Sequence, residues 1–467
     1  MMKSERREWH CGLFFAGLIL TIPALFSLLP ASASSGWGIS HIHAALLGGT
    51  TALLTAALAS AYGREICLQK GFAWLAYGLL SGGMVILALE PIGIGVDPWV
   101  SVAAGFVLGA GKAWAFLLWA RLFSWLPLAS MLAHSSAACL FAGVLAWLVM
   151  GLRAEWVIAV AVAAPFILAT AYAYSCSALS FDSSRKEYDV KFQKVGRLPW
   201  RPIIIMALVG FVAALGPIAT FGITVTLEEV ALLPMGALTL GFLIWVKAFR
   251  SEYLLKAAFA VYGVGFLLPL VHSEWSILAG FIVSMSYWGM ALFVFWFLCN
   301  DVREKKSSTG WTFGVSFALL DIMQLVGYVL PQMGLVVPSA NEGGALGVFT
   351  IAAIALAVAG AALWATEHVG QGHWSRQFVG SNATEASHSA RPGESELAFR
   401  CRMSGQACGL TFREEEILVL LLERNTINQI AHQLFLSGNT VKTHVKHIYG
   451  KMGVHNRDEL RAAVLGS

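Results

Sequence analysis

The amino-acid sequence predicts an all-α membrane protein that ends in a small helical domain. Three observations carry this prediction. Hydrophobic residues make up 57% of the 467 residues and charged residues only 12%, whereas soluble domains carry roughly 25% charged residues. Apolar runs long enough to cross a bilayer recur along residues 1–366. From Leu410 onward the composition becomes that of a soluble helical domain.

The spanning helices are predicted from runs of about 20 mostly apolar residues. Twelve such runs occur, at 11–30, 41–62, 71–93, 98–122, 126–151, 155–180, 202–222, 229–249, 253–272, 276–299, 311–334 and 344–366. The long connection 180–201 divides this twelve-helix bundle into two halves of six helices, 11–180 and 202–366. The first run is too long for the core of a signal peptide, so we interpret it as a retained spanning helix.

The positive-inside rule predicts the orientation of these helices. With a cytoplasmic N-terminus, the inner segments hold eighteen Lys and Arg residues, whereas the outer segments hold only Arg153. The bias repeats at successive crossings, which also supports the number of helices. An even number of crossings places the C-terminus in the cytoplasm.

A flexible cytoplasmic linker is predicted for residues 367–409. This stretch is rich in Gly, Ser, His and Ala and shows no helical periodicity. As a flexible coil it would span roughly 35–40 Å. Five of the seven Cys residues lie in or beside apolar runs and are interpreted as packing residues. Cys401 and Cys408 lie in the linker, where a redox pair is the less favoured alternative.

Four helices are predicted in the C-terminal domain, residues 410–467. Pairs of a polar residue and a Glu or Gln three residues later mark helix starts. These pairs are Thr411 with Glu414, Thr426 with Gln429 and Asn456 with Glu459. Ser437 caps the remaining helix. A short helix, a tight turn and a longer helix together form a helix-turn-helix.

The longer helix, which begins after Ser437, has two different faces. One face carries apolar residues at helical spacing and is predicted to be buried; its members are Val441, Val445, Ile448 and Met452. The opposite face carries Lys442, Thr443 and Lys446. No acidic residue occurs between Asn425 and Asn456. Basic charge therefore gathers on one face, as phosphate binding requires, although an ordinary solvated helix face is the alternative.

The segment LTFREEEILVLL…TINQIAHQLFLSGNTVKTHVKHIYGKMGVHNRDEL resembles the LuxR-type (GerE-like) DNA-binding domain over about 55 residues. The resemblance implies that Lys442, Thr443 and Lys446 enter the major groove of double-stranded DNA and contact base edges. It also implies phosphate contacts, which set the register of the domain; they are Asn439, Thr440, His444 and Lys451. Members of this family usually bind as homodimers, which implies a dimer contact at residues 457–465.

The twelve-helix part resembles the major facilitator superfamily in architecture, with two halves and a long basic central loop. The loop between the second and third helices, YGREICLQKG, lacks the Asp and the paired basic residues of that superfamily's signature. Intramembrane ionisable residues are candidates for function. Lys112 and Asp321 lie near mid-membrane, where they either pair or line a shared cavity. Glu90 lies near the outer end of its helix and His134 about a third of the way from the inner end; for all four, a satisfied interior polar group is the alternative.

The sequence contains no P-loop, GxSxG, HExxH or dinucleotide-binding pattern. We therefore predict a protein that is not an enzyme and uses no cofactor or metal. The leading hypothesis is a bacterial one-component transcriptional regulator in the inner (cytoplasmic) membrane. Its partners would be DNA, the lipid bilayer and an unknown small-molecule signal. One alternative is a secondary transporter with a regulatory DNA-binding tail, and another is a tail that binds protein.

Overall fold

The computed structural model describes residues 11–28, 41–69, 71–179, 195–196, 198–216, 229–245, 257–265, 268, 275–305, 307–332, 356, 360, 397, 400–401, 404–405, 408, 410, 412–423, 425–434 and 438–465. Over these residues the regular elements are helices, which confirms the all-α prediction. The chain forms two compact units, Met1–Val369 and Gly370–Ser467.

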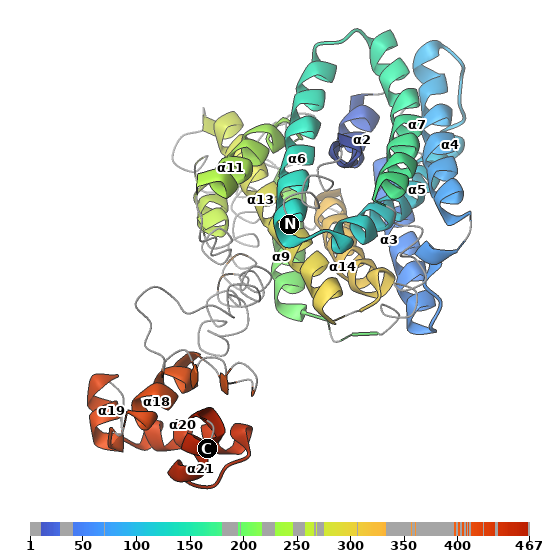
Figure 1. Cartoon of the computed structure of the whole chain (residues 1–467). Helices are drawn as coiled ribbons and strands as arrows, with labels where there is room; N and C mark the ends of the chain where they lie inside the picture. The colour runs from blue at the N-terminus through green and yellow to red at the C-terminus, as the bar shows by residue number, and fades with distance from the viewer. Residues whose placement is uncertain are drawn as a thin grey trace. The chain divides into compact units, whose positions relative to one another are not determined.

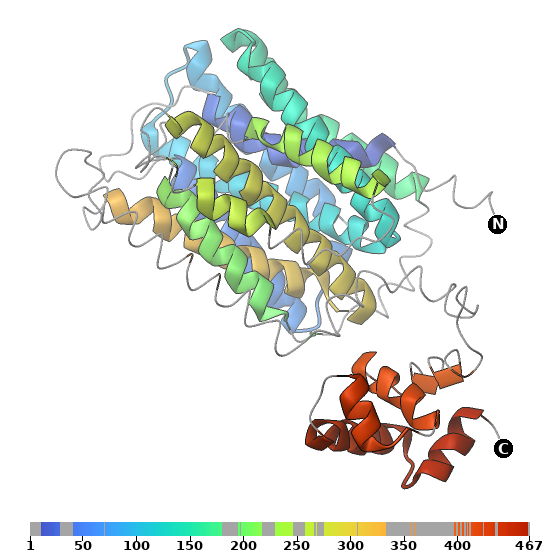
Figure 2. The same cartoon turned by 90° about the vertical axis from the view of Figure 1, so that its left-hand side faces the viewer.

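The first unit is a bundle of long helices that run side by side (Figure 1; Figure 2). Its described elements are η1 (Cys11–Ala16), α2 (Gly17–Leu28), α3 (His41–Ala61), η2 (Ile66–Leu68), α4 (Phe72–Leu89), η3 (Glu90–Ile92), α5 (Pro98–Trp125), α6 (Leu128–Met150), α7 (Ala154–Ala178), α9 (Trp200–Gly216), α11 (Leu232–Trp245), α13 (Ser276–Lys305) and α14 (Thr309–Gln332). Several helix pairs join the two predicted halves, among them α3 with α14, α6 with α11 and α5 with α13.

The helices of the first unit agree with the predicted membrane-spanning runs. Among the described residues, seven helices are long and apolar enough to cross a membrane. The chain is thus a multi-pass membrane protein, and each long helix overlaps one predicted span. The span 253–272 is described only at 257–265 and 268, where it is helical. Two further parts lie outside the described residues: the central loop 180–194 and, apart from residues 356 and 360, the span 344–366. The number of twelve spanning helices therefore stays a prediction.

Helix α3 is held between two helices that present glycine pairs to it. On α5, a Cβ on Gly105 or Gly109 would overlap backbone carbonyl groups of α3. On α14, a Cβ on Gly310 or Gly314 would crowd the backbone and small side chains of α3. Both pairs have the spacing Gly-x-x-x-Gly, which lets membrane helices approach until their backbones touch. These contacts fix the positions of α5 and α14 around α3.

Exposed aromatic side chains mark the two ends of the spanning helices. Tyr62 and Trp74 lie where α3 ends and α4 begins, and each exposes more than four fifths of its surface. Trp99, Trp147 and Trp156 lie near the opposite helix ends and are also exposed. Trp and Tyr concentrate at the two membrane–water interfaces. Their positions are therefore those expected of spanning helices.

The second unit contains the predicted four-helix domain, as α18 (Phe412–Leu422), α19 (Ile427–Gln433), α20 (Gly438–Met452) and α21 (Arg457–Leu465). Two of the predicted caps are confirmed. The Thr426 N–H donates to Gln429 Oε1 over 2.8 Å, and Gln429 N–H donates to Thr426 Oγ1 over 3.4 Å. Glu459 N–H donates to Asn456 Oδ1 over 2.8 Å. The caps at Thr411 and Ser437 lie outside the described residues.

The core of this unit begins upstream of the predicted boundary at Leu410. Cys401, which the sequence suggests is part of the linker, is fully buried in the core, and Leu397 packs against it. The residues 397, 400, 401, 404 and 405 are helical. A four-residue spacing between Leu397 and Cys401 places both on one helix face. The polar residues around them mask this short apolar stripe in the sequence, and most of the predicted linker lies outside the described residues.

The two cysteines of this segment are expected to react differently with alkylating reagents. Burial raises the pKa of the Cys401 thiol to about 12, whereas Cys408 is exposed. Because the thiolate is the nucleophile, iodoacetamide at pH 8 is expected to modify Cys408 within minutes and Cys401 only after unfolding. Peptide mass mapping of the full chain measures both sites. Equal rates at the two cysteines in the folded protein would contradict the burial of Cys401.

Candidate nucleic-acid interface and intramembrane polar groups

Helix α20 has the two faces that its sequence predicts. Val441 and Ile448 are fully buried in the core, and Val445 and Met452 pack against that core. Lys442, Thr443 and Lys446 are exposed. The Thr443 Oγ1 donates to the Asn439 carbonyl oxygen over 3.0 Å, which leaves the methyl group available for an apolar contact.

The four predicted phosphate-contact residues have different surroundings. Asn439 and Thr440 are exposed in the first turn of α20, while His444 is half-buried. Lys451 forms an ion pair inside the domain, with its Nζ 2.7 Å from Oε2 of Glu414 on α18. Glu414 is almost completely buried. Lys451 is thus held by a partner inside the domain, whereas Lys442, Thr443 and Lys446 are exposed.

Helix α21 is tied to the domain through its first residue. The Arg457 guanidinium donates to the Leu421 carbonyl oxygen and, over 3.1 Å, to the Asn425 carbonyl oxygen. The Leu421 carbonyl group lies in the last turn of α18, where a cation is favourable, and that of Asn425 lies in the turn that follows the helix. Arg457 thus holds α21 against α18. The remaining exposed side chains of α21 belong to residues 458–463, with the exception of the buried Leu460.

Two of the predicted intramembrane residues, Lys112 and Asp321, lie close to each other. Asp321 on α14 packs against α3, where a Cβ on Gly49 would lie 3.1 Å from its Oδ2 atom. The Lys112 ammonium on α5 exerts a Coulomb attraction on the Asp321 carboxyl group. One turn further along α14, Gln324 Nε2 donates to Tyr287 Oη over 2.8 Å. Lys112 and Asp321 therefore form a polar layer where α14 faces α3 and α5, predicted to lie near mid-membrane.

The other two predicted residues lie elsewhere in the unit. Glu90 is the first residue of η3 and interacts electrostatically with His41. His134 is fully buried, donates from Nδ1 to the Ser130 carbonyl oxygen over 2.7 Å, and stacks on Phe14. The helix that carries His134 therefore supplies its hydrogen-bond acceptor. The structure brings together Lys112 and Asp321 but neither Glu90 nor His134 with them.

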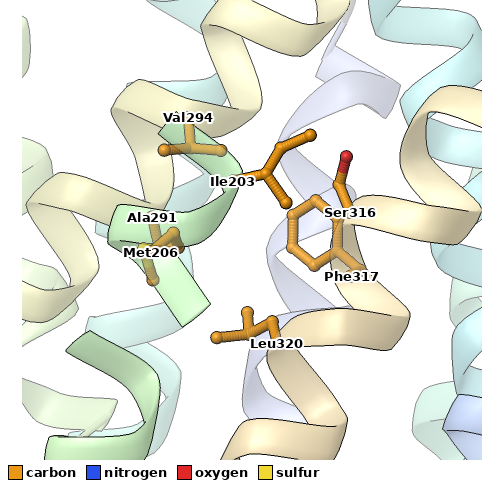
Figure 3. Close-up of a pocket in the computed structure, with 7 residues that line it drawn as sticks. All are labelled: Ile203, Met206, Ala291, Val294, Ser316, Phe317 and Leu320. Atoms are coloured by element: carbon orange, nitrogen blue, oxygen red, sulfur yellow. The ribbon is translucent and has the colours of Figure 1, made fainter. Parts of the chain in front are cut away.

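A small pocket lies between α9, α13 and α14 (Figure 3). Its lining is apolar except for Ser316, whose hydroxyl donates to the Thr312 carbonyl oxygen over 2.5 Å. Ligand sites usually combine an apolar wall with a few polar groups that orient the ligand. The hydroxyl hydrogen of Ser316 is already used within α14, and this pocket is interpreted as a packing gap.

A buried carboxyl group that the sequence reasoning missed connects the two halves at the predicted cytoplasmic side. Glu65 follows α3, and its Oε1 accepts from the Gly310 N–H over 2.8 Å. Its Oε2 accepts from Ser60 over 3.1 Å and from Ser308. The carboxyl group thus lies at the N-terminus of α14, where the helix dipole favours negative charge. At the other end of the same helix pair, His43 and Tyr328 make an edge contact with ring centroids 6.4 Å apart.

Two substitutions of Glu65 are expected to show whether its hydrogen bonds or its charge stabilise the membrane unit. Burial raises the pKa of the Glu65 carboxyl group in spite of the hydrogen bonds that it accepts. A neutral amide is therefore a close mimic, and Glu65→Gln is expected to keep most of the stability. Glu65→Ala removes all three bonds and is expected to cost about 2 kcal/mol. Thermal unfolding of the detergent-purified protein measures both; a larger loss in the Gln variant than in the Ala variant would refute this account.

A helix-turn-helix with a basic exposed helix, carried by a chain of membrane-spanning helices, defines a membrane-anchored member of the helix-turn-helix class. Residues 409–463 match the family described as "Bacterial regulatory proteins, luxR family". The chain is 40% identical over 50 residues to the spore germination protein GerE of Bacillus subtilis, covering 68% of that protein and 11% of this chain. Through this domain the chain belongs to the luxR family.

Other relatives are similar to the chain over a similarly short length. The CsgBAC operon transcriptional regulatory protein of Escherichia coli is 45% identical over 56 residues, which is 12% of this chain and 26% of that protein. The HTH-type transcriptional regulator MalT of Vibrio cholerae is 42% identical over 50 residues, which is 11% of this chain and 6% of that protein. The chain thus spans about a quarter or less of the length of these two relatives.

Several solved structures align with most of this chain, and the first of them is covered over nearly its full length. It is a bacterial homologue of the iron transporter ferroportin in an outward-facing state, with 13% identity, a TM-score of 0.49, and coverage of 76% of this chain and 98% of that chain.

Glu65 and Glu414 are buried acids that were not identified from the sequence, although Glu414 has a signal there. Glu414 shares a helix face with Ile417, Leu418 and Leu421, at spacings of three, four and seven residues. This spacing predicts burial, and buried acids need a partner. Glu65 has no such signal, because its partners Ser308 and Gly310 are more than 240 residues away in the chain.

Proposed function

We propose that this protein is a membrane-bound one-component transcriptional regulator, in which α20 binds promoter DNA in response to a signal sensed by the membrane unit. The observation that carries the proposal is the exposed row of Lys442, Thr443 and Lys446 on the second helix of a luxR-family helix-turn-helix, in a chain that also spans a membrane. The row matches the chemistry of direct readout, since Lys donates to guanine and a Thr methyl group meets thymine.

The finer features of the proposal follow from the sequence. The bias of Lys and Arg supports cytoplasmic termini in a bacterial cell, with the spanning helices in the inner membrane. Asn439, Thr440 and His444 would contact phosphates beside the base-reading row. Two copies would bind together through α21, each reading one half-site. None of the proposed steps is enzymatic.

Selection from a random-sequence duplex pool tests the proposal. The full chain, reconstituted in lipid nanodiscs, is incubated with the pool at about 100 mM salt, and bound duplexes are amplified over several rounds. We expect enrichment of a sequence with two related half-sites about one helical turn apart. If the chain still binds all duplex sequences equally well after repeated rounds, the proposal that it is a transcriptional regulator is refuted.

A transport assay separates the sensor from a transporter with a regulatory tail. The mid-membrane polar layer of Lys112 and Asp321 is compatible with binding a signal and, equally, with moving a substrate. For a sensor, candidate ligands that shift DNA affinity are expected not to accumulate in proteoliposomes. Accumulation of such a ligand above its level in protein-free vesicles would show that the membrane unit transports it, and would contradict the proposal of a sensor without transport.

A further inference from the structure

The C-terminal half of α20 is attached to the domain by one buried carboxyl group. Glu414, on the first turn of α18, has its Oε2 atom 2.7 Å from Lys451 Nζ and its Oε1 atom 3.9 Å from His447 Nδ1. Lys451 and His447 are four residues apart and therefore lie one above the other on the same face of α20. One carboxyl group thus faces two side chains on successive turns of the helix.

The contact with Glu414 restricts the rotation of α20, which the apolar core contacts do not. The core contacts of α20, through Val441 and Ile448, hold it against α18 and α19 but are not directional. A charge-assisted hydrogen bond has a defined length and direction. The bond from Lys451 therefore constrains the rotation of α20 about its own axis, and His447 lies near the same carboxyl group without a hydrogen bond to it. The rotation in turn sets the direction in which Lys442 and Lys446 project.

We propose that Glu414 is a positioning residue for DNA recognition: through Lys451 and His447 it sets the rotation of α20, and so the placement of Lys442 and Lys446 on base edges. Lys451 lies nine residues, or about 13 Å along the helix, from Lys442. In this arrangement Lys451 acts on α20 through Glu414, in place of the phosphate contact that the family resemblance implies. The inference rests on the proposed function.

Four variants of the full chain test the proposal: Glu414→Gln, Lys451→Gln, the pair Glu414→Met/Lys451→Met, and Glu423→Gln as the control. Glu423 is an exposed acid at the end of α18, so its replacement removes the same charge away from α20. The probes are the duplex that the wild-type chain selects and an unselected random-sequence duplex. Affinity for each is measured between about 50 and 200 mM salt, with circular dichroism as a check of helix content.

Loss of specificity without loss of general DNA affinity is the expected result. Glu414→Gln and Lys451→Gln are expected to weaken binding to the selected duplex by about 10- to 100-fold and to the random duplex by less than about threefold. The salt dependence is expected to stay unchanged, because no phosphate contact is lost. Glu423→Gln is expected to match the wild type. The Met pair leaves no unpaired buried charge, so it is expected to fold and to show the same loss of specificity.

Three results would overturn the proposal. In the first, Glu414→Gln keeps the wild-type preference for the selected duplex. In the second, Lys451→Gln weakens both duplexes equally and lowers the salt slope by about 0.9, as loss of one phosphate contact would. In the third, which decides the matter if Glu414→Gln unfolds, the folded Met pair retains wild-type specificity. A wild-type chain that selects no duplex at all would instead refute the proposed function itself.

Discussion

Replacing Lys442 and Lys446 together with alanine is expected to abolish sequence-specific DNA binding by the full chain. Both side chains are exposed on α20, whereas the core residues of the same helix are buried. Each base contact of this kind contributes about 1–3 kcal/mol, so the double variant is expected to lose at least about 30-fold in affinity for the selected duplex. Titration of labelled duplex into nanodisc-embedded protein measures this loss.

A charge-conserving variant provides the control for this result. Lys442→Arg/Lys446→Arg keeps both positive charges but changes the geometry of the donors. It is expected to retain affinity for random-sequence DNA while its preference among sequences changes. Neither substitution touches the core, so thermal unfolding is expected to match the wild type in both variants. If the alanine variant still recognises the selected duplex as tightly as the wild type, α20 is not the reading helix.

Replacing Gly109 with leucine is expected to disrupt the packing of the membrane unit. A Cβ on Gly109 would overlap the carbonyl oxygen of Ala45 on α3. Backbone atoms cannot rotate away as a flexible side chain can, so α3 and α5 would have to move apart. Overpacking costs about 1–3 kcal/mol and sometimes more, and we expect the upper part of this range. The apparent melting temperature of the detergent-purified chain and its yield from membranes measure the effect.

The same substitution at Gly78 provides a matched control. Gly78 lies on the exposed face of α4, and a Cβ there would meet no atom within 4 Å. Gly78→Leu is therefore expected to leave the melting temperature within a few degrees of the wild type. Equal losses at both positions would indicate that leucine in any spanning helix disturbs insertion, and would contradict a specific α3–α5 contact.

The sequence predicted the helices well because the signals for them are local. The run 98–122 became α5 (Pro98–Trp125), and the pair Thr426 and Gln429 caps α19 as its spacing predicted. A spanning helix must satisfy its own backbone groups, so an apolar run of sufficient length is almost enough evidence for one. The faces of α20 followed from the same kind of local periodicity.

The interactions that the sequence did not predict join residues far apart in the chain. Glu65 meets Gly310, and the glycines of α5 meet α3, only after the bundle has formed. Lys451 looked available to DNA because its partner, Glu414, lies 37 residues earlier in the chain. Cys401 was assigned to the linker because Leu397 and Cys401 are too few apolar residues to stand out. In each case the missing information was which helix faces which.

The Glu65 contact also has a mechanical consequence for the membrane unit. The bonds from Ser308 and Gly310 make the predicted cytoplasmic end of the α3–α14 pair the pivot for any tilt of α14 against α3. At the opposite end, the described contacts include the edge contact of His43 with Tyr328. Helix α14 has 24 residues, which makes it a lever about 36 Å long. A tilt of only about 5° at the pivot would displace the far end of this lever by about 3 Å.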